Sequence, residues 1–125
     1  MVDGDTINVL IDGQDYRLRY IGIDTPETVD PRRPVECFGK EASERNRQLV
    51  EGKTVGLESD VSDTDRFGRL LRYVWVDGQM VNATLVEEGY AHASTYPPDV
   101  RYAKLLAALQ ADAREAGRGL WGAGC

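Results

Sequence analysis

The chain has 125 residues, 42% of them hydrophobic and 29% charged, which is the composition of a single globular domain spanning residues 1–125. Its 15 basic and 21 acidic side chains give a net charge of −6. Proteins that coat nucleic acid through bulk charge are basic, so this composition excludes passive coating. Any contact with phosphate has to come from a few basic side chains gathered at one site or from a bound metal ion. The apolar runs are too short to span a bilayer, so we expect no membrane partner.

The N-terminal part of the chain is predicted to form strands and turns. Residues 6–11 and 16–21 are rich in β-branched, aromatic and other apolar side chains, and the Asp-Gly pair at 12–13 between them is typical of a hairpin turn. Prolines between residues 26 and 34 then indicate irregular chain.

The rest of the chain mixes predicted helices and strands. Helices are expected at residues 39–50, 82–88 and about 99–116, and strands at 53–58, 70–76 and 80–81. The last helix carries one apolar stripe formed by Tyr102, Leu105, Leu106, Leu109 and Ala113. About five strands with three interspersed helices predict an α+β fold, a small antiparallel barrel with helices packed outside it.

Asp5, Asp24 and Glu27 are carboxylates that lie next to predicted strands. Hard divalent cations such as Ca²⁺ bind several oxygen ligands from carboxylates, main-chain carbonyls and water. Two aspartates and one carbonyl would leave coordination positions for water and a substrate phosphate. These residues therefore indicate a candidate cation site.

Arg19 and Arg69 offer planar guanidinium groups that match phosphate oxygens bidentately. A metal, two arginines and a spare carboxylate together have the parts for phosphodiester hydrolysis. The cations stabilise charge on the pentacoordinate phosphorus, and the carboxylate orients or deprotonates the attacking water.

Each motif by itself also has a purely structural interpretation. The Asp-Gly pair at 3–4 is typical of a turn, and Asp24 before Thr-Pro is typical of a loop cap. Strand arginines often pair at the surface, where they contribute little. The acidic run 60–69 lacks the central glycine and the closing glutamate of an EF-hand, so Asp63 and Asp65 are predicted to form turns.

Taken together, seven motifs in one register resemble the staphylococcal nuclease (thermonuclease) family. They are DGDT at 3–6, RYIGIDTPET at 19–28, FGKEAS at 38–43, TDRFGR at 64–69, YVWVDGQMVN at 73–82, LVEEGYA at 85–91 and GLW at 119–121. The resemblance covers nearly the whole chain. It implies an OB-fold barrel of five strands with three α-helices, which agrees with the fold predicted from the residues.

The resemblance also implies a role for each matching position. Asp5 and Asp24 match the calcium-ligating aspartates, and Thr25 matches the residue that lends a main-chain carbonyl. Glu27 matches the glutamate held to activate the attacking water.

Arg19 and Arg69 match the two arginines that grip the scissile phosphate. The implied activity is calcium-dependent, sugar-nonspecific hydrolysis of DNA and RNA to 3′-phosphate products, with single-stranded substrate preferred and a monomeric enzyme. Two alternatives stay open: a catalytically inactive OB-type module that binds nucleic acid, and an interaction domain that packs against protein partners.

Three positions near the implied substrate site bear on binding. Phe67 stands where the family has a tyrosine, so we expect weaker recognition of a terminal phosphate. Arg66 keeps a cation near phosphate, at a position where the resemblance implies a lysine. Tyr96 is the one aromatic residue left of two that sandwich a base in the family, and a loop aromatic packed on the barrel is the alternative.

The two ends of the chain carry two further expectations. Met1 and Val2 alone precede DGDT, where the family has most of its first strand, so we expect a poorly covered barrel edge. Cys37 and Cys125 are either free thiols of a cytosolic protein or a disulfide. The bridge is the favoured interpretation, partly because secreted relatives look similar here, and it implies a secreted or extracytoplasmic location.

Overall fold

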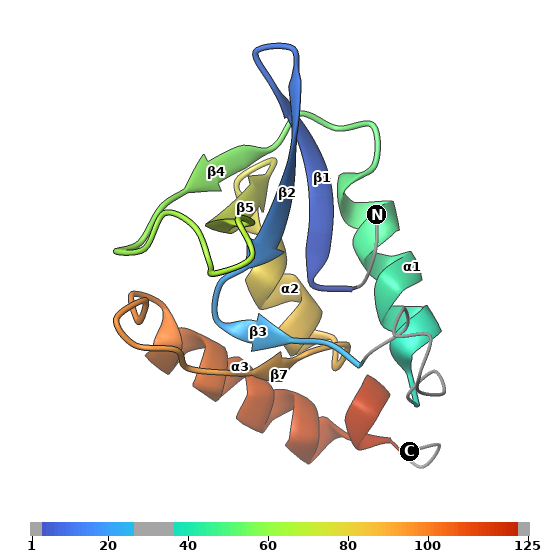
Figure 1. The fold of residues 1–125 in the computed structure, drawn as a ribbon. Helices are drawn as coiled ribbons and strands as arrows, with labels where there is room; N and C mark the ends of the chain where they lie inside the picture. The colour runs from blue at the N-terminus through green and yellow to red at the C-terminus, as the bar shows by residue number, and fades with distance from the viewer. Residues whose placement is uncertain (1–3, 27–36, 123–125) are drawn as a thin grey trace.

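The computed structural model describes residues 4–26 and 37–122 (Figure 1). Its strands are β1 (Thr6–Ile11), β2 (Gln14–Tyr20), β3 (Ile23–Asp24), β4 (Gly56–Glu58), β5 (Leu70–Val76), β6 (Gln79–Met80) and β7 (His92–Ala93). Its helices are α1 (Gly39–Val50), α2 (Val81–Glu87) and α3 (Ala103–Ala116), followed by the short 3₁₀ helix η1 (Gly119–Trp121).

Five strands form the main sheet, in the order β1-β2-β5-β4 with β6 paired to β5, and β3 and β7 form a separate two-stranded sheet. Helix α1 lies beside β1, and α3 runs below the β3–β7 pair (Figure 1). The α+β class and the OB-type arrangement with three helices are confirmed. Within the described residues the sheet does not close, because β1 and β4 are not paired with each other.

The prediction of a wholly antiparallel barrel is wrong at one place. Strands β2 and β5 are parallel, with Leu18 opposite Leu70. Parallel neighbours need a long crossover, and here the chain passes through β3, α1 and β4 before it returns as β5. The strands β3 and β7, of two residues each, were not predicted, because so short a segment carries no periodicity.

The predicted Asp-Gly hairpin turn at residues 12–13 is confirmed, and a second Asp-Gly pair, at residues 77–78, joins β5 to β6 in the same way. Asp12 and Gly13 have φ angles of 50° and 82°, and Asp77 and Gly78 have 50° and 78°. Positive φ at both central residues is the type I′ geometry that matches the twist of paired strands. The sequence signal was sufficient here because the turn needs only local chemistry.

Helix α1 has the predicted bounds, whereas α3 begins later than predicted, at Ala103. The preceding residues are committed to other contacts: the Asp99 carboxylate accepts hydrogen bonds from the main-chain N–H groups of Val61 and Ser62, at 3.0 and 2.7 Å. Leu105 departs from the predicted apolar stripe, because its side chain is exposed.

The core lies between the sheet and the helices and includes Leu18, Ile23, Val74, Leu85 and Leu106. A buried amide links three parts of it. The Asn82 side chain of α2 accepts from Val74 N–H of β5 at 2.9 Å and donates to the Ile21 carbonyl at 2.8 Å. This pairing holds the turn between β2 and β3 against the core, and the two strands that flank this turn carry Arg19 and Asp24, described below.

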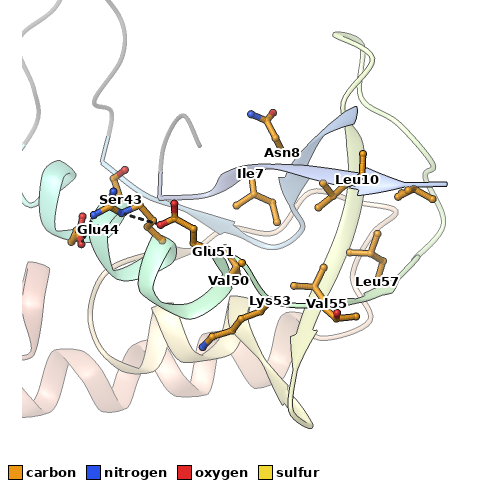
Figure 2. A pocket seen from close by; sticks show the side chains of 15 residues that line it. Ile7, Asn8, Leu10, Ser43, Glu44, Val50, Glu51, Lys53, Val55 and Leu57 are labelled. Atoms are coloured by element: carbon orange, nitrogen blue, oxygen red, sulfur yellow. Dashed lines mark hydrogen bonds and ion pairs between the residues drawn. The ribbon is translucent and has the colours of Figure 1, made fainter. Parts of the chain in front are cut away.

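A groove of about 750 Å³ lies between the unpaired edges of β1 and β4 (Figure 2). Its lining comes from β1, from the part of α1 between Ser43 and Val50, from residues 51–55 and from Leu57. Among the described carboxylates and arginines predicted to be functional, not one lines this groove, so the candidate site is elsewhere. No helix in the described part of the chain combines the length and apolar character needed to cross a membrane.

Candidate active site

Asp5 lies immediately before β1 and is buried. Its carboxylate accepts a hydrogen bond from the Thr25 main-chain N–H at 3.0 Å and another from the Thr6 hydroxyl at 3.2 Å. Its main-chain carbonyl accepts from Tyr20 N–H at 2.9 Å. These bonds fix the carboxylate next to the chain segment that follows β3.

Gly4 allows this close approach. A Cβ atom at Gly4 would lie 2.9 Å from Thr25 Cγ2 and 3.0 Å from Ala42 Cβ. No side chain larger than hydrogen fits between the start of β1, Thr25 and α1. The glycine of the DGDT motif therefore serves a packing purpose in addition to forming a turn.

Arg19, near the end of β2, is the centre of the site. Its Nη1 donates to the carbonyls of Tyr20 and Ile23, at 3.0 and 2.8 Å. Its Nη2 forms an ion pair with Asp5 Oδ2 at 3.4 Å and donates to Asp24 Oδ1. The two carboxylates, one before β1 and one at the end of β3, thus face the same guanidinium nitrogen.

The other oxygen of Asp24 is also occupied. Asp24 Oδ2 accepts from the Ser94 hydroxyl at 3.0 Å and from the Tyr96 hydroxyl at 2.8 Å. The hydrogen bond to Asp24 is the main reason why the pKa of Tyr96 is raised above its ordinary value. Pairing of β3 with β7 places Asp24 opposite His92, which brings the segment after β7 to this carboxylate.

Sequence reasoning did not identify Ser94. A lone serine after an unpredicted two-residue strand carries no signal, and its position follows from the β3–β7 pairing alone. Tyr96 was expected either to stack on a base or to pack on the barrel. Tyr96 is 55% exposed as a residue and its hydroxyl binds Asp24, so it is not buried against the barrel, and stacking on a base stays a prediction.

The donor set at this point suits a hard cation. Asp5 and Asp24 already face one positive group, and Thr25 Oγ1 is buried with no hydrogen-bond partner among the described residues. Carboxylate, hydroxyl and carbonyl oxygens are the ligands that Ca²⁺ prefers. No group of three or more His, Cys, Asp or Glu side chains within residues 4–26 and 37–122 has a metal-binding arrangement. The fit therefore rests on these two aspartates and on oxygens of other kinds.

Arg69 belongs to a second cluster, in the loop before β5. The Asp65 carboxylate accepts from Arg69 Nε at 2.7 Å and from the main-chain N–H groups of Phe67 and Arg69 at 2.9 and 3.0 Å. Asp65 thus forms the turn, as predicted, and also holds the arginine. Of Asp5, Arg19 and Asp24, none has a hydrogen bond or ion pair with Arg69 in the described structure.

The two clusters lie along neighbouring strands. Arg19 of β2 is opposite Leu71 of β5, and Arg69 precedes Leu71 by two positions. Arg69 itself lies one residue before β5, in the loop that leads into the strand paired with β2. Phe67 is 70% exposed, and the guanidinium groups of Arg66 and Arg69 lie 4.9 and 5.5 Å from its ring centroid.

Two predicted residues fall outside the described part of the chain. Glu27, the predicted water-activating carboxylate, lies there, as does Cys125. Cys37 is disulfide-bonded, and there is no free cysteine among the described residues. The pairing of Cys37 with Cys125 stays a prediction.

Comparison with known proteins identifies relatives over most of this chain. The family model described as "Staphylococcal nuclease homologue" matches residues 17–123. The chain is 43% identical over 121 residues to the protein named Thermonuclease from Staphylococcus intermedius, covering 97% of this chain and 72% of that protein. It is 42% identical, with the same coverage, to Thermonuclease from Staphylococcus hyicus.

Endonuclease YncB from Bacillus subtilis is 46% identical over 103 residues, which is 81% of this chain and 49% of that protein. The chain thus spans about half the length of YncB and most of the two staphylococcal proteins. With a family model over most of its length and relatives above 40% identity, the chain belongs to the staphylococcal nuclease family.

Proposed function

We propose that this protein is a calcium-dependent nuclease that hydrolyses phosphodiester bonds of DNA and RNA and leaves 3′-phosphate ends. The observation that carries the proposal is the convergence of Asp5 and Asp24 on one nitrogen of Arg19. Membership of the family, and relatives named thermonuclease and endonuclease, support it.

The cation would be held by the carboxylates of Asp5 and Asp24 and by the main-chain carbonyl of Thr25. When bound, Ca²⁺ supplies positive charge to the phosphate and acidifies a coordinated water. Burial of Asp5 and its bond from Thr25 N–H fix one ligand before the cation arrives. Preformed ligands lower the ordering cost of binding.

The two arginines would bind the scissile phosphate. Arg19 is held in place through its Nη1, which donates to two carbonyls, so its guanidinium plane is fixed at the site. Arg69 is held through its Nε by Asp65, which leaves its terminal nitrogens as donors to phosphate oxygens. We assign Glu27 to orient or deprotonate the attacking water.

Arg66, Phe67 and Tyr96 would contact the substrate beyond the scissile bond. The exposed rings of Phe67 and Tyr96 offer faces on which unpaired bases stack, which favours single-stranded DNA or RNA. Arg66 adds a cation beside the Phe67 ring. We expect the enzyme to act as a monomer, without a membrane partner, and as the single domain 1–125.

The disulfide supports an extracytoplasmic location. Cys37 is disulfide-bonded, and such bonds persist mainly outside the reducing cytosol. We therefore propose that Cys37 pairs with Cys125 and that the protein works in a secreted or other extracytoplasmic setting.

Incubation with single-stranded and plasmid DNA tests the proposed activity. Cleavage is expected with Ca²⁺, and none with a chelator. Glu27→Ser and Arg69→Ala are each expected to reduce the rate by at least ~100-fold, the scale for a lost acid–base or charge-stabilising group. Arg47→Ala is the matched control, because the ion pairs of Arg47 within the described part of the chain are with Glu44 and Glu51, at the surface along α1 and its C-terminal end.

Two outcomes would contradict the proposal. Binding of the DNA without Ca²⁺-dependent cleavage would favour the inactive OB-type module. Cleavage that survives both Glu27→Ser and Arg69→Ala would show that the hydrolysis comes from another site or from a contaminant.

A further inference from the structure

The carboxylate of Asp24 is held differently from that of Asp5. The difference points to a role for Ser94 and Tyr96 in positioning Asp24. Asp5 is buried and bonded by a main-chain N–H. The Asp24 side chain is 41% exposed, and the bonds to its outer oxygen come from two side chains of a distant segment. The carboxylate of a half-exposed side chain at the end of a short strand is free to rotate unless other groups restrain it.

We propose that Ser94 and Tyr96 are positioning residues for Asp24, and that their two hydroxyls set the Ca²⁺ affinity of the site. The proposal rests on the proposed function, because it takes Asp24 as a calcium ligand.

The two carboxylate oxygens of Asp24 have different partners. Oδ2 accepts from the Ser94 hydroxyl at 3.0 Å and the Tyr96 hydroxyl at 2.8 Å. Oδ1 faces Arg19, on the side where Asp5 also lies. With Oδ2 restrained by two donors, Oδ1 stays directed at the point that both carboxylates share.

The two hydroxyls are themselves anchored by the fold. Ser94 N–H donates to the Gly22 carbonyl at 2.8 Å, which ties the segment after β7 to the turn between β2 and β3. Asp24 is opposite His92 in the β3–β7 pair, so Ser94 follows directly along the same segment. Tyr96 lies two residues farther on and forms a bridge to Asp99, which is buried.

Hydroxyl donors suit this task better than a charged group would. They orient the carboxylate without adding a second positive charge to that of Arg19, which already contacts Asp24. Partners of this kind behind a metal ligand typically change metal affinity by about 10–100-fold when they are removed. We infer that the loop 94–96 has an energetic effect at the cation site although it supplies no ligand.

The ring and the hydroxyl of Tyr96 have two separate proposed roles. Its ring is exposed and available for stacking, whereas its hydroxyl is engaged with Asp24. Tyr96→Phe removes the hydroxyl and keeps the ring, and Tyr96→Ala removes both. If Tyr96 acts only by stacking on a base, Tyr96→Phe is expected to leave Ca²⁺ binding unchanged. If its hydroxyl positions Asp24, the same substitution is expected to weaken Ca²⁺ binding.

Isothermal titration calorimetry of the full chain with CaCl₂, without nucleic acid, tests the proposal. Ser94→Ala and Tyr96→Phe are each expected to weaken Ca²⁺ binding by about 10-fold or more, and the double variant further. Ser94→Thr restores a hydroxyl and is expected to bind nearly as the unmodified protein does. Tyr16→Phe is the matched control, because the Tyr16 hydroxyl bonds to Gln14 in the β1–β2 hairpin.

Steady-state kinetics on single-stranded DNA provide a second readout. For Tyr96→Phe, the rate is expected to recover as Ca²⁺ is raised, with KM for DNA unchanged. For Tyr96→Ala, KM is expected to stay high even at saturating Ca²⁺, because the stacking face is lost.

The outcomes separate the two proposals. Unchanged Ca²⁺ affinity in folded Ser94→Ala and Tyr96→Phe, beside measurable binding by the unmodified protein, would overturn the positioning role and leave the nuclease assignment intact. Absence of Ca²⁺ binding by the unmodified protein would overturn both. Equal weakening in Ser94→Thr and Ser94→Ala would also contradict the role, since a hydroxyl at that position would then not matter. Thermal unfolding of each variant identifies any that is misfolded, and Tyr96→Phe, the smallest change, then decides the outcome.

Discussion

The main-chain N–H of Thr25 donates to the Asp5 carboxylate at 3.0 Å, across a sequence separation of 20 residues. This bond joins the residue before β1 to the residue after β3, and so it brings together the two parts of the proposed cation site, which lie next to strands of different sheets. Whatever separates these two segments is expected to separate Asp5 from Asp24 as well.

Gly4→Ala tests this dependence. The added Cβ would lie 2.9 Å from Thr25 Cγ2 and 3.0 Å from Ala42 Cβ, and Ala42 is fully buried. We expect a loss of about 1–3 kcal/mol in the free energy of unfolding, the usual cost of overpacking, together with weaker Ca²⁺ binding. Urea denaturation and calorimetry measure the two effects.

Gly56→Ala is the control for that substitution, because a Cβ there would meet Trp75 at an ordinary 3.5 Å. Equal stability and equal Ca²⁺ affinity for Gly4→Ala and the unmodified protein would contradict the packing account of the DGDT glycine.

Asp65→Asn is expected to affect substrate binding but not cation binding. The Asp65 carboxylate holds Arg69 through its Nε and also bonds two main-chain N–H groups of the same loop. An amide keeps the shape but loses the charge pair, so we expect kcat/KM to fall by about 10-fold, or ~1.4 kcal/mol. Ca²⁺ affinity should be unchanged, and a parallel loss of Ca²⁺ affinity would mean that the two clusters are coupled.

The unfolding free energy is expected to fall in acid because of Glu58 and Asp60. Partial desolvation by itself raises the pKa of Glu58, but hydrogen bonds from Arg101, Tyr102 and Trp75 outweigh it and hold that pKa below its ordinary value. The pKa of Asp60 is lowered in the same way, with desolvation opposed mainly by bonds from Arg101 N–H and the Tyr73 hydroxyl.

A carboxyl whose pKa is lower in the folded than in the unfolded state contributes stability that is complete above the unfolded pKa, about 4. That contribution is lost as the pH falls through the lower, folded pKa. Urea denaturation between pH 6 and pH 2.5 measures it, and Glu58→Gln should show a shallower decline. Stability that rises on acidification from pH 5 to pH 3 would contradict this account.

Activity is expected to fall as salt is raised. The protein carries a net charge of −6, so a few focused cations have to hold a polyanionic substrate. Raising NaCl from ~50 to ~200 mM should therefore reduce kcat/KM on single-stranded DNA through screening and counterion effects. Thermal unfolding over the same range is the control for loss of fold. A flat kcat/KM would mean that charge is not what retains the substrate.

The two cysteines are expected to be bridged to each other. Cys37 is disulfide-bonded, and the chain has two cysteines in total. Alkylation of the denatured protein without reductant should add no label, and alkylation after reduction should add two labels per chain, while the protein has the size of one chain both before and after reduction. A species of twice the mass before reduction would show instead that Cys37 pairs with a second copy.

The sequence by itself determined the parts of this protein that depend on neighbouring residues. The two Asp-Gly hairpins, the bounds of α1 and the strands β1 and β5 follow from local turn chemistry and residue propensity. The motifs around Asp5, Arg19 and Asp24 also identified the residues that meet in the site, and the family to which the chain belongs.

Only the tertiary structure decided what depends on contacts between distant segments. The parallel pairing of β2 with β5, the open edge between β1 and β4, and the β3–β7 pair that brings Ser94 and Tyr96 to Asp24 leave no local pattern. Pairing of strands and convergence of side chains are set by the path of the whole chain and by what the core can bury. Local propensity therefore supplied the residues of the site, and long-range packing supplied its geometry.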